Sequence, residues 1–89
     1  MEVPNDIMFR YLERRKNDLN DCVLYLEKKN FIKLEKLGHQ LKGNGVTFGH
    51  PELSSIGILL ESAARQSDLK SSYQAVESFS RWVKDHQPN

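Results

Sequence analysis

The sequence predicts an all-α protein, an antiparallel up-and-down bundle of four helices. Apolar residues recur at helical spacing in four successive segments, and no segment alternates apolar and polar residues as a half-buried strand does. Short polar or glycine-containing stretches separate the segments, so consecutive helices are expected to run antiparallel. With 89 residues, the chain has the length of one small domain, and we expect residues 1–89 to form a single unit.

The first predicted helix runs from about Asn5 to Lys29. Asn5 and Asp6 follow Pro4 and are candidate N-caps. Steps of four and three residues give one stripe along this helix, formed by Met8, Leu12, Arg15, Leu19, Cys22 and Leu26. Arg15 interrupts the apolar stripe. Two expectations therefore stay open, one continuous helix or a helix that is bent or split near Arg15.

The second predicted helix runs from about Phe31 to Phe48, with Asn30 as its N-cap. At about 100° per residue, one side of this helix is apolar, and it carries Leu34, Leu37, Leu41, Gly45 and Phe48. The opposite side carries Glu35, His39, Lys42, Gly43 and Val46. His39 is therefore predicted to face solvent.

The third predicted helix begins at Pro51, after a C′ glycine at Gly49. Its buried stripe is formed by Leu53, Ile56, Leu60, Ala63 and Ala64. Ser67 and Asp68 are expected to form the next turn and cap. The fourth helix follows, with a buried stripe of Leu69, Tyr73, Val76, Phe79 and Val83. Pro88 falls beyond its end, and we expect Trp82 to be a packing residue.

Composition excludes several classes of function. The 13 Lys and Arg residues nearly balance the 12 Asp and Glu residues, so a nucleic-acid partner is not expected. No run approaches the roughly 18 apolar residues of a membrane span, and no signal peptide is visible, so a cytoplasmic location and no membrane association are the default expectations. Cys22 is the only cysteine, which leaves no disulfide and no cysteine metal site.

Gly43 and Gly45, both within the second helix, indicate where the chain does its chemistry, since each glycine costs about 1 kcal/mol relative to alanine. Gly45 lies on the apolar side, where a missing side chain lets a neighbouring helix approach. Gly43 lies on the exposed side beside His39, where packing does not explain it. A neutral imidazole is a nucleophile, and Lys42, one turn along, could stabilise a phosphoryl group on it. Gly43 would let a partner protein approach.

The pattern His39-x-x-Lys42-Gly43-x-x-x-x-x-Gly49, followed by Pro51-Glu52-Leu53 and Leu60-Glu61, resembles histidine-containing phosphotransfer (HPt) domains. The chain is similar to the phosphotransfer domain of the chemotaxis histidine kinase and to small stand-alone bacterial HPt proteins. The likeness extends over most of the chain and includes the first-helix segment 11–19. In the family, the two positions after the Lys-Gly pair are often small residues such as serine or alanine. Here they are Asn44 and Gly45.

The resemblance implies a phosphorelay intermediate of a two-component system. His39 would accept a phosphoryl group on Nε2 from a receiver aspartate or a histidine kinase and pass it to a response-regulator aspartate. Lys42 would stabilise the phosphate, Gly43 would admit the receiver, and Glu61 would hold the imidazole through Nδ1. The phosphoprotein would be a monomer and a stoichiometric carrier, not an enzyme. It would have no ATP-binding kinase domain and no cofactor, because the Mg²⁺ belongs to the receiver.

Other interpretations are weaker. A non-phosphorylated adaptor that binds a receiver or a sensor or hybrid kinase is the main alternative. A metal-dependent hydrolase would need more inward-facing ligands than the buried stripes contain. We expect no metal site, because His39 and His50 lack a third ligand; His50 is expected in a turn, and His86 in solvent at a helix end.

Three residues of the first predicted helix have two interpretations each. Ile7, Met8 and Tyr11 either line a docking surface near His39 or pack in the core. The sequence pattern alone leaves both expectations open for each of the three.

Overall fold

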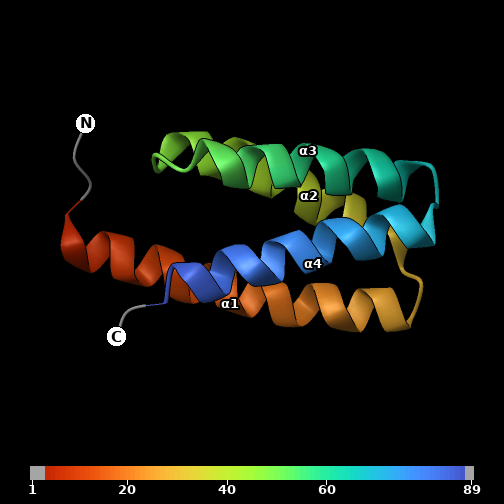
Figure 1. The fold of residues 1–89 in the computed structure, drawn as a ribbon, viewed down its shortest axis with the longest axis horizontal. Helices are drawn as coiled ribbons and strands as arrows, with labels where there is room; N and C mark the ends of the chain where they lie inside the picture. Colours follow the sequence, from red (N-terminus) through yellow and green to blue (C-terminus); the bar gives the residue numbers. More distant parts are fainter. Residues whose placement is uncertain (1–3, 88–89) are drawn as a thin grey trace.

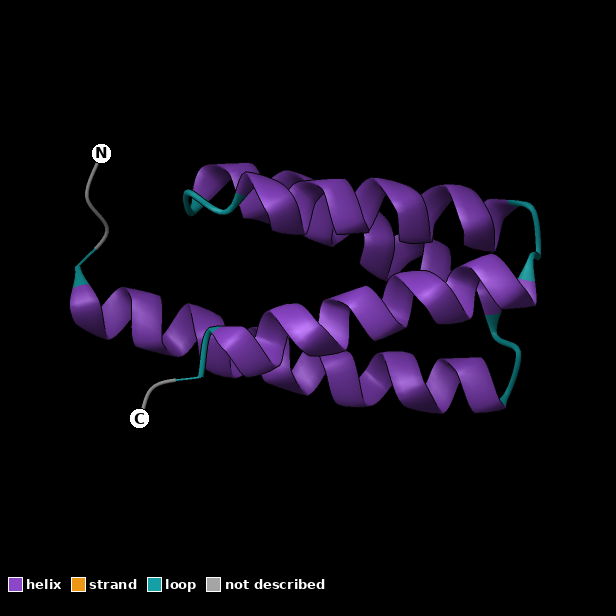
Figure 2. Ribbon diagram, viewed as in Figure 1, coloured by secondary structure: helices purple, strands orange, loops and turns teal. Residues whose placement is uncertain are grey.

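In the computed structural model, which describes residues 4–87, four helices run up and down in antiparallel order (Figure 1). They are α1 (Asn5–Glu27), α2 (Phe31–Thr47), α3 (Pro51–Arg65) and α4 (Leu69–Asp85). Short loops join the helices, and no strand occurs within residues 4–87 (Figure 2). The bundle measures 37 × 22 × 17 Å. The predicted all-α four-helix bundle is confirmed.

Each connection between helices has three residues, 28–30, 48–50 and 66–68. The middle residue of each has a left-handed backbone, with φ of 53° at Lys29, 82° at Gly49 and 52° at Ser67. This conformation at C′ ends a helix and reverses the chain. Gly49 was predicted in this position, whereas Lys29 was predicted to be helical.

Side-chain caps begin two of the helices as predicted. The Asn30 side chain accepts a hydrogen bond from the Lys33 backbone N–H (3.2 Å), and Asp68 accepts one from the Ser71 N–H (3.1 Å). The prediction of Asn5 or Asp6 as the first N-cap is wrong. Pro4 precedes α1, and its carbonyl accepts from the Met8 N–H (2.9 Å), so Asn5 is already helical.

Arg15 does not split the first helix, since α1 is continuous from Asn5 to Glu27. Its guanidinium forms an ion pair with Asp18 (2.9 Å) and lies over the ring of Tyr11, 4.7 Å from the ring centre. Because both partners lie on α1 itself, the charge is compensated without any break in the helix. Tyr11, not Arg15, provides the buried contact at this level of the bundle.

The core lies between all four helices, and α2 and α3 pack most closely. Gly38 of α2 and Gly57 of α3 face each other at the contact: a Cβ atom at Gly38 would lie 2.6 Å from the Glu61 backbone nitrogen and 2.9 Å from the Gly57 carbonyl oxygen. The two helix backbones therefore touch here, with no side chain between them. Fully buried side chains at the centre include Leu34, Leu41, Leu53, Leu60 and Phe79.

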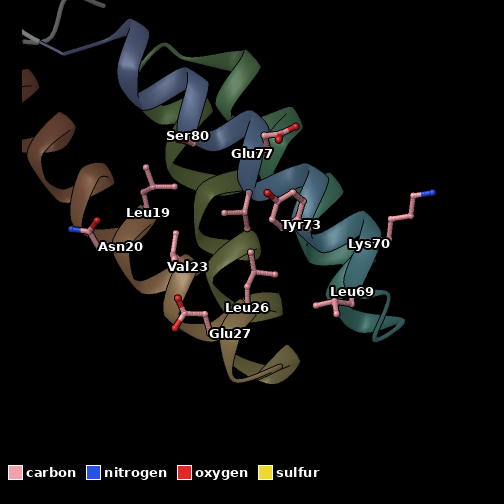
Figure 3. A pocket seen from close by; sticks show the side chains of 11 residues that line it. Leu19, Asn20, Val23, Leu26, Glu27, Leu69, Lys70, Tyr73, Glu77 and Ser80 are labelled. Carbon is pink, nitrogen blue, oxygen red and sulfur yellow. The ribbon is translucent and has the colours of Figure 1, made fainter.

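The start of α4 departs from the predicted buried stripe. Val76, Phe79 and Val83 are buried, but Leu69 and Tyr73 are 40 % and 59 % exposed. The physical reason is a groove of about 980 Å³ between the end of α1 and the start of α4. Its apolar walls come from both helices, among them Leu19, Val23, Leu26, Leu69 and Tyr73 (Figure 3). Trp82 is buried, as predicted.

Candidate functional site

His39 lies on the exposed face of α2, as predicted, with 66 % of its side chain accessible to solvent. Within residues 4–87, only one of its ring nitrogens has a close partner: Nδ1 lies 2.8 Å from Oε2 of Glu61 on α3. The contact between Glu61 and the imidazole that the resemblance implied is therefore present. The imidazole is held at one edge and open to solvent at the other.

Glu61 contacts three basic side chains where α2 packs against α3. Its side chain is only 11 % exposed. Besides His39, it accepts a hydrogen bond from Lys42 Nζ at Oε1 (3.2 Å) and lies 3.5 Å from the Arg65 guanidinium. Burial raises the pKa of this carboxyl, but hydrogen bonds from His39 and Lys42 outweigh that effect, so the pKa lies below its usual value of 4.5. Glu61 is therefore ionised at neutral pH.

An ionised Glu61 determines which tautomer His39 adopts. A carboxylate can only accept hydrogen bonds, so the bond at 2.8 Å requires the proton on Nδ1. In the neutral ring, Nε2 then carries the free lone pair. The pairing with Glu61 thus leaves the nucleophilic nitrogen of His39 on the exposed side of the ring.

Glycines bring Glu61 within reach of His39. A Cβ atom at Gly38, the residue before His39, would collide with the backbone of Glu61. The Ser54 hydroxyl adds a second link between the helices, donating to the Lys42 carbonyl (2.7 Å). Close approach of the two backbones at Gly38 and Gly57 is therefore the local cause of the short bond between His39 and Glu61.

Gly43 and Gly45 face opposite ways, as predicted. A Cβ atom at Gly45 would lie 2.5 Å from Ser54 Oγ and 2.6 Å from the Ser54 backbone nitrogen. At Gly43, a Cβ atom would meet no atom of the described residues within 4 Å. Packing within the monomer explains the first glycine and gives no reason for the second.

No family model, curated protein or solved structure matches this chain. Neither a family nor a function can therefore be carried over from a relative. What remains is the chemistry of the side chains around His39.

The surface around His39 is partly apolar. A shallow hollow of about 420 Å³ beside the imidazole is lined by Ile32, Glu35, Lys36, His39 and Glu61. Ile32 is 83 % exposed and Val46 is 66 % exposed. Ile32, His39, Gly43 and Val46 follow one another at steps of seven, four and three residues, so they form one stripe along α2. We call this stripe the α2 face.

Sequence reasoning missed Arg65. Its Nε donates to Glu35 Oε2 (3.1 Å), and its Nη2 lies 3.5 Å from Glu61 Oε2, so it links both carboxylates near His39. The signal was available, because Arg65 follows Glu61 by four residues and lies on the same side of α3. Lys42 was expected to stabilise a phosphoryl group on His39, and in this structure its ammonium donates to Glu61 Oε1.

The three candidate docking residues of α1 have different environments. Tyr11 is buried; it stacks on Phe48 with ring centres 4.1 Å apart and donates to Asn44 Oδ1 (2.7 Å). Met8 is partly buried against the core. Ile7 is 45 % exposed. Of the three, only Ile7 remains available to a partner.

The side chains of the other two histidines are partly covered, and His50 lies in the connection before α3, as predicted. His50 is the N-cap residue of α3 with a side chain only 16 % exposed, and His86 ends α4 with 30 % of its side chain exposed. His86 stacks on Trp82 with ring centres 4.2 Å apart, and the His50 ring lies edge-on to both at 5.1 Å. The expectation of a solvated His86 is therefore wrong, because the indole covers one face of its ring.

Proposed function

We propose that this protein is a histidine phosphotransfer protein, which carries a phosphoryl group on His39 between the domains of a phosphorelay. One observation carries the proposal: an exposed imidazole is fixed at Nδ1 by an ionised carboxylate at 2.8 Å and left free at Nε2. A histidine with only a packing role has no need for this pairing at the surface. The family resemblance of the sequence points to the same residue.

The proposed transfer needs no proton from the protein. The Nε2 lone pair attacks the phosphorus of a phosphoaspartate on a receiver domain. The N–P bond forms as the P–O bond to the aspartate breaks, and the aspartate leaves as a carboxylate. The Nδ1 proton stays in its bond to Glu61, which stabilises the positive charge that develops on the ring. The same step in reverse passes the group to a response regulator.

Lys42 supplies the cation for the phosphoryl oxygens. Its ammonium lies one helical turn from His39 and is 41 % exposed, so it can move. In this structure, Lys42 Nζ donates to Oε1 of Glu61 (3.2 Å), the carboxylate that also holds His39. A phosphoryl group on Nε2 adds negative charge beside it, and the ammonium can turn toward those oxygens as Arg65 continues to neutralise Glu61.

The α2 face is the surface on which a receiver would dock. Gly43 exposes backbone beside His39, so a receiver can bring its aspartate close to the imidazole. Ile32 and Val46 place exposed apolar side chains on either side of this gap, as the core of a small transient interface requires. The partners would be receiver domains, whose own Mg²⁺ serves the aspartate, and a sensor or hybrid histidine kinase.

The proposal is tested by phosphoryl uptake. The wild-type protein is incubated with a phosphorylated receiver domain and Mg²⁺, and we expect a label on the protein that is labile in acid and stable in base. His39→Gln, which retains a polar side chain on an exposed helix face, should take up no label. A protein that binds the receiver with its histidine intact but never takes up label would be an adaptor, and the proposal would be wrong.

Docking is tested separately at Gly43. Gly43→Arg places a long side chain beside His39 and should slow transfer at least about tenfold, as expected when a docked geometry is displaced. Gln74→Arg introduces the same side chain at an exposed position on α4 and serves as the matched control. Equal transfer rates for the two variants would contradict the docking role of the α2 face.

A further inference from the structure

Three side chains with metal-binding atoms meet at one end of the bundle. His50 lies in the connection between α2 and α3, Glu52 lies in the first turn of α3, and His86 is at the end of α4. One ligand atom of each lies within 4.8 Å of the other two. Residues from separate segments of the chain thus converge on one small volume.

The distances from Glu52 to the two histidines suit a bridging metal ion better than direct hydrogen bonds. His50 Nδ1 and His86 Nε2 each lie 3.7 Å from Glu52 Oε1, beyond the 3.2 Å that limits ordinary hydrogen bonds. An ion with bonds of about 2.0–2.2 Å holds two tetrahedral ligands about 3.3–3.6 Å apart. A shift of a few tenths of an ångström would bring each histidine nitrogen to this separation from Glu52 Oε1.

Hydrogen bonds to Trp82 orient two of the three side chains, His86 and Glu52. His86 Nδ1 lies 2.8 Å from the Trp82 carbonyl oxygen, which can only accept, so the proton is on Nδ1 and the Nε2 lone pair faces Glu52. The Trp82 indole N–H donates to Glu52 Oε1 (3.1 Å). Ligand histidines and carboxylates in metal sites are oriented by outer contacts of this kind.

We propose, against the expectation of no metal site from the sequence, that His50, Glu52 and His86 bind a divalent transition-metal ion of the zinc class. Two imidazoles and one carboxylate are a known zinc ligand set, and a fourth position is left for water or for a donor from a partner. Mg²⁺ and Ca²⁺ prefer all-oxygen sites, so they are not expected to bind here. The ion would tie the end of α4 to the connection between α2 and α3. The proposal is independent of phosphoryl transfer at His39.

The test is a Zn²⁺ titration of the full-length, tag-free protein after treatment with a chelator. We expect binding of one ion per chain by calorimetry, a rise in Tm with Zn²⁺ concentration, and no response to Mg²⁺. Cu²⁺ should quench the emission of Trp82, the only tryptophan, because the indole stacks on His86. Glu52→Gln and His86→Gln should each weaken Zn²⁺ binding at least about tenfold.

The matched control is His39→Gln, which removes a more exposed histidine that also has a carboxylate partner. It should bind Zn²⁺ as tightly as the wild type. Zn²⁺ binding that is lost with His39→Gln, or unchanged in Glu52→Gln and His86→Gln, would overturn the proposal. Imidazole NMR signals of the wild-type protein give a readout that needs no substitution. Zn²⁺ should shift those of His50 and His86, and a shift at His39 alone would overturn the assignment.

Discussion

Adding a single methyl group at two glycines of α2 should change stability in opposite directions. Gly38 and Gly43 are both in the interior of this helix, so replacement by alanine brings the same gain in helix propensity, about 1 kcal/mol. They differ in their surroundings. Gly38 faces the backbone of α3, and Gly43 faces open space. The comparison therefore separates helix propensity from helix packing within one helix.

The distances give the size of each effect. At Gly43, a Cβ atom meets nothing within 4 Å, so Gly43→Ala should stabilise the protein by about 0.5–1 kcal/mol. At Gly38, the Cβ atom would lie 2.6 Å from the Glu61 nitrogen and 2.9 Å from the Gly57 oxygen, both backbone atoms that cannot rotate away. Overpacking costs about 1–3 kcal/mol, and close contact with two backbone atoms puts Gly38→Ala toward the upper part of that range, a net loss of about 1 kcal/mol or more.

Urea unfolding followed by circular dichroism measures both changes. We expect the midpoint to rise for Gly43→Ala and to fall for Gly38→Ala, with m unchanged in each. In a domain of this length, 1 kcal/mol corresponds to roughly 4–8 °C in Tm. A loss of stability in Gly43→Ala would mean that this glycine has a role inside the monomer, and its assignment to partner access would be refuted. A stable Gly38→Ala would refute the backbone contact between α2 and α3.

Further predictions concern the residues around the site. Glu61→Ala removes the acceptor that keeps the proton of His39 on Nδ1, so the imidazole ¹⁵N shifts should change and phosphoryl uptake should slow on the order of tenfold. Glu61→Gln should retain an acceptor for this bond. Identical ¹⁵N shifts in Glu61→Ala and wild type would count against the orientation role. Because folding lowers the pKa of Glu61, the stability from its contacts is present above pH 4.5 and is lost as the pH falls through the folded-state pKa. Acid unfolding should therefore show this loss of stability in the wild type and not in Glu61→Gln. Tyr11→Phe removes the hydrogen bond to Asn44 and should cost about 1 kcal/mol in urea unfolding; no change would mean the bond contributes nothing net. Burial, with Asp18 and Asp21 nearby, raises the pKa of the Cys22 thiol to about 12, so iodoacetamide should label it in urea but not in the native protein; rapid native labelling would contradict its burial.

Local signals in the sequence were enough to predict the four helices and most of the positions at which they begin and end. Asn30, Gly49 and Asp68 act within one or two residues of a helix end, so their type alone predicted the cap or turn. Lys29 and Ser67 adopt the same left-handed backbone without a residue that favours it. At these two positions the packing of the bundle, not local preference, determines where the chain turns.

Features that depend on how helices meet could not be predicted from one segment. The helical period placed Tyr73 on the buried stripe, but the period does not tell how closely α1 approaches α4, and the residue is exposed. Gly38 and Gly57 are unremarkable until α2 and α3 are placed face to face.

The candidate site shows the same division. The exposure of His39 followed from periodicity, whereas its contact with Glu61 came from the family resemblance. The contact of Arg65 with Glu61 could have been predicted from spacing, because Arg65 follows Glu61 by four residues on one helix. The meeting of His50 with His86 required the tertiary fold, because the two residues lie on segments that the sequence does not connect.

The most direct test of the central claim is to locate the phosphoryl group. After incubation with a phosphorylated receiver and Mg²⁺, ³¹P–¹H correlation NMR or mass spectrometry at alkaline pH should find one phosphoryl group, on Nε2 of His39. His39→Gln should carry none and should remain folded by circular dichroism. A phosphoryl group on His50, on His86 or on Nδ1 of His39, or persistent label in His39→Gln, would contradict the account.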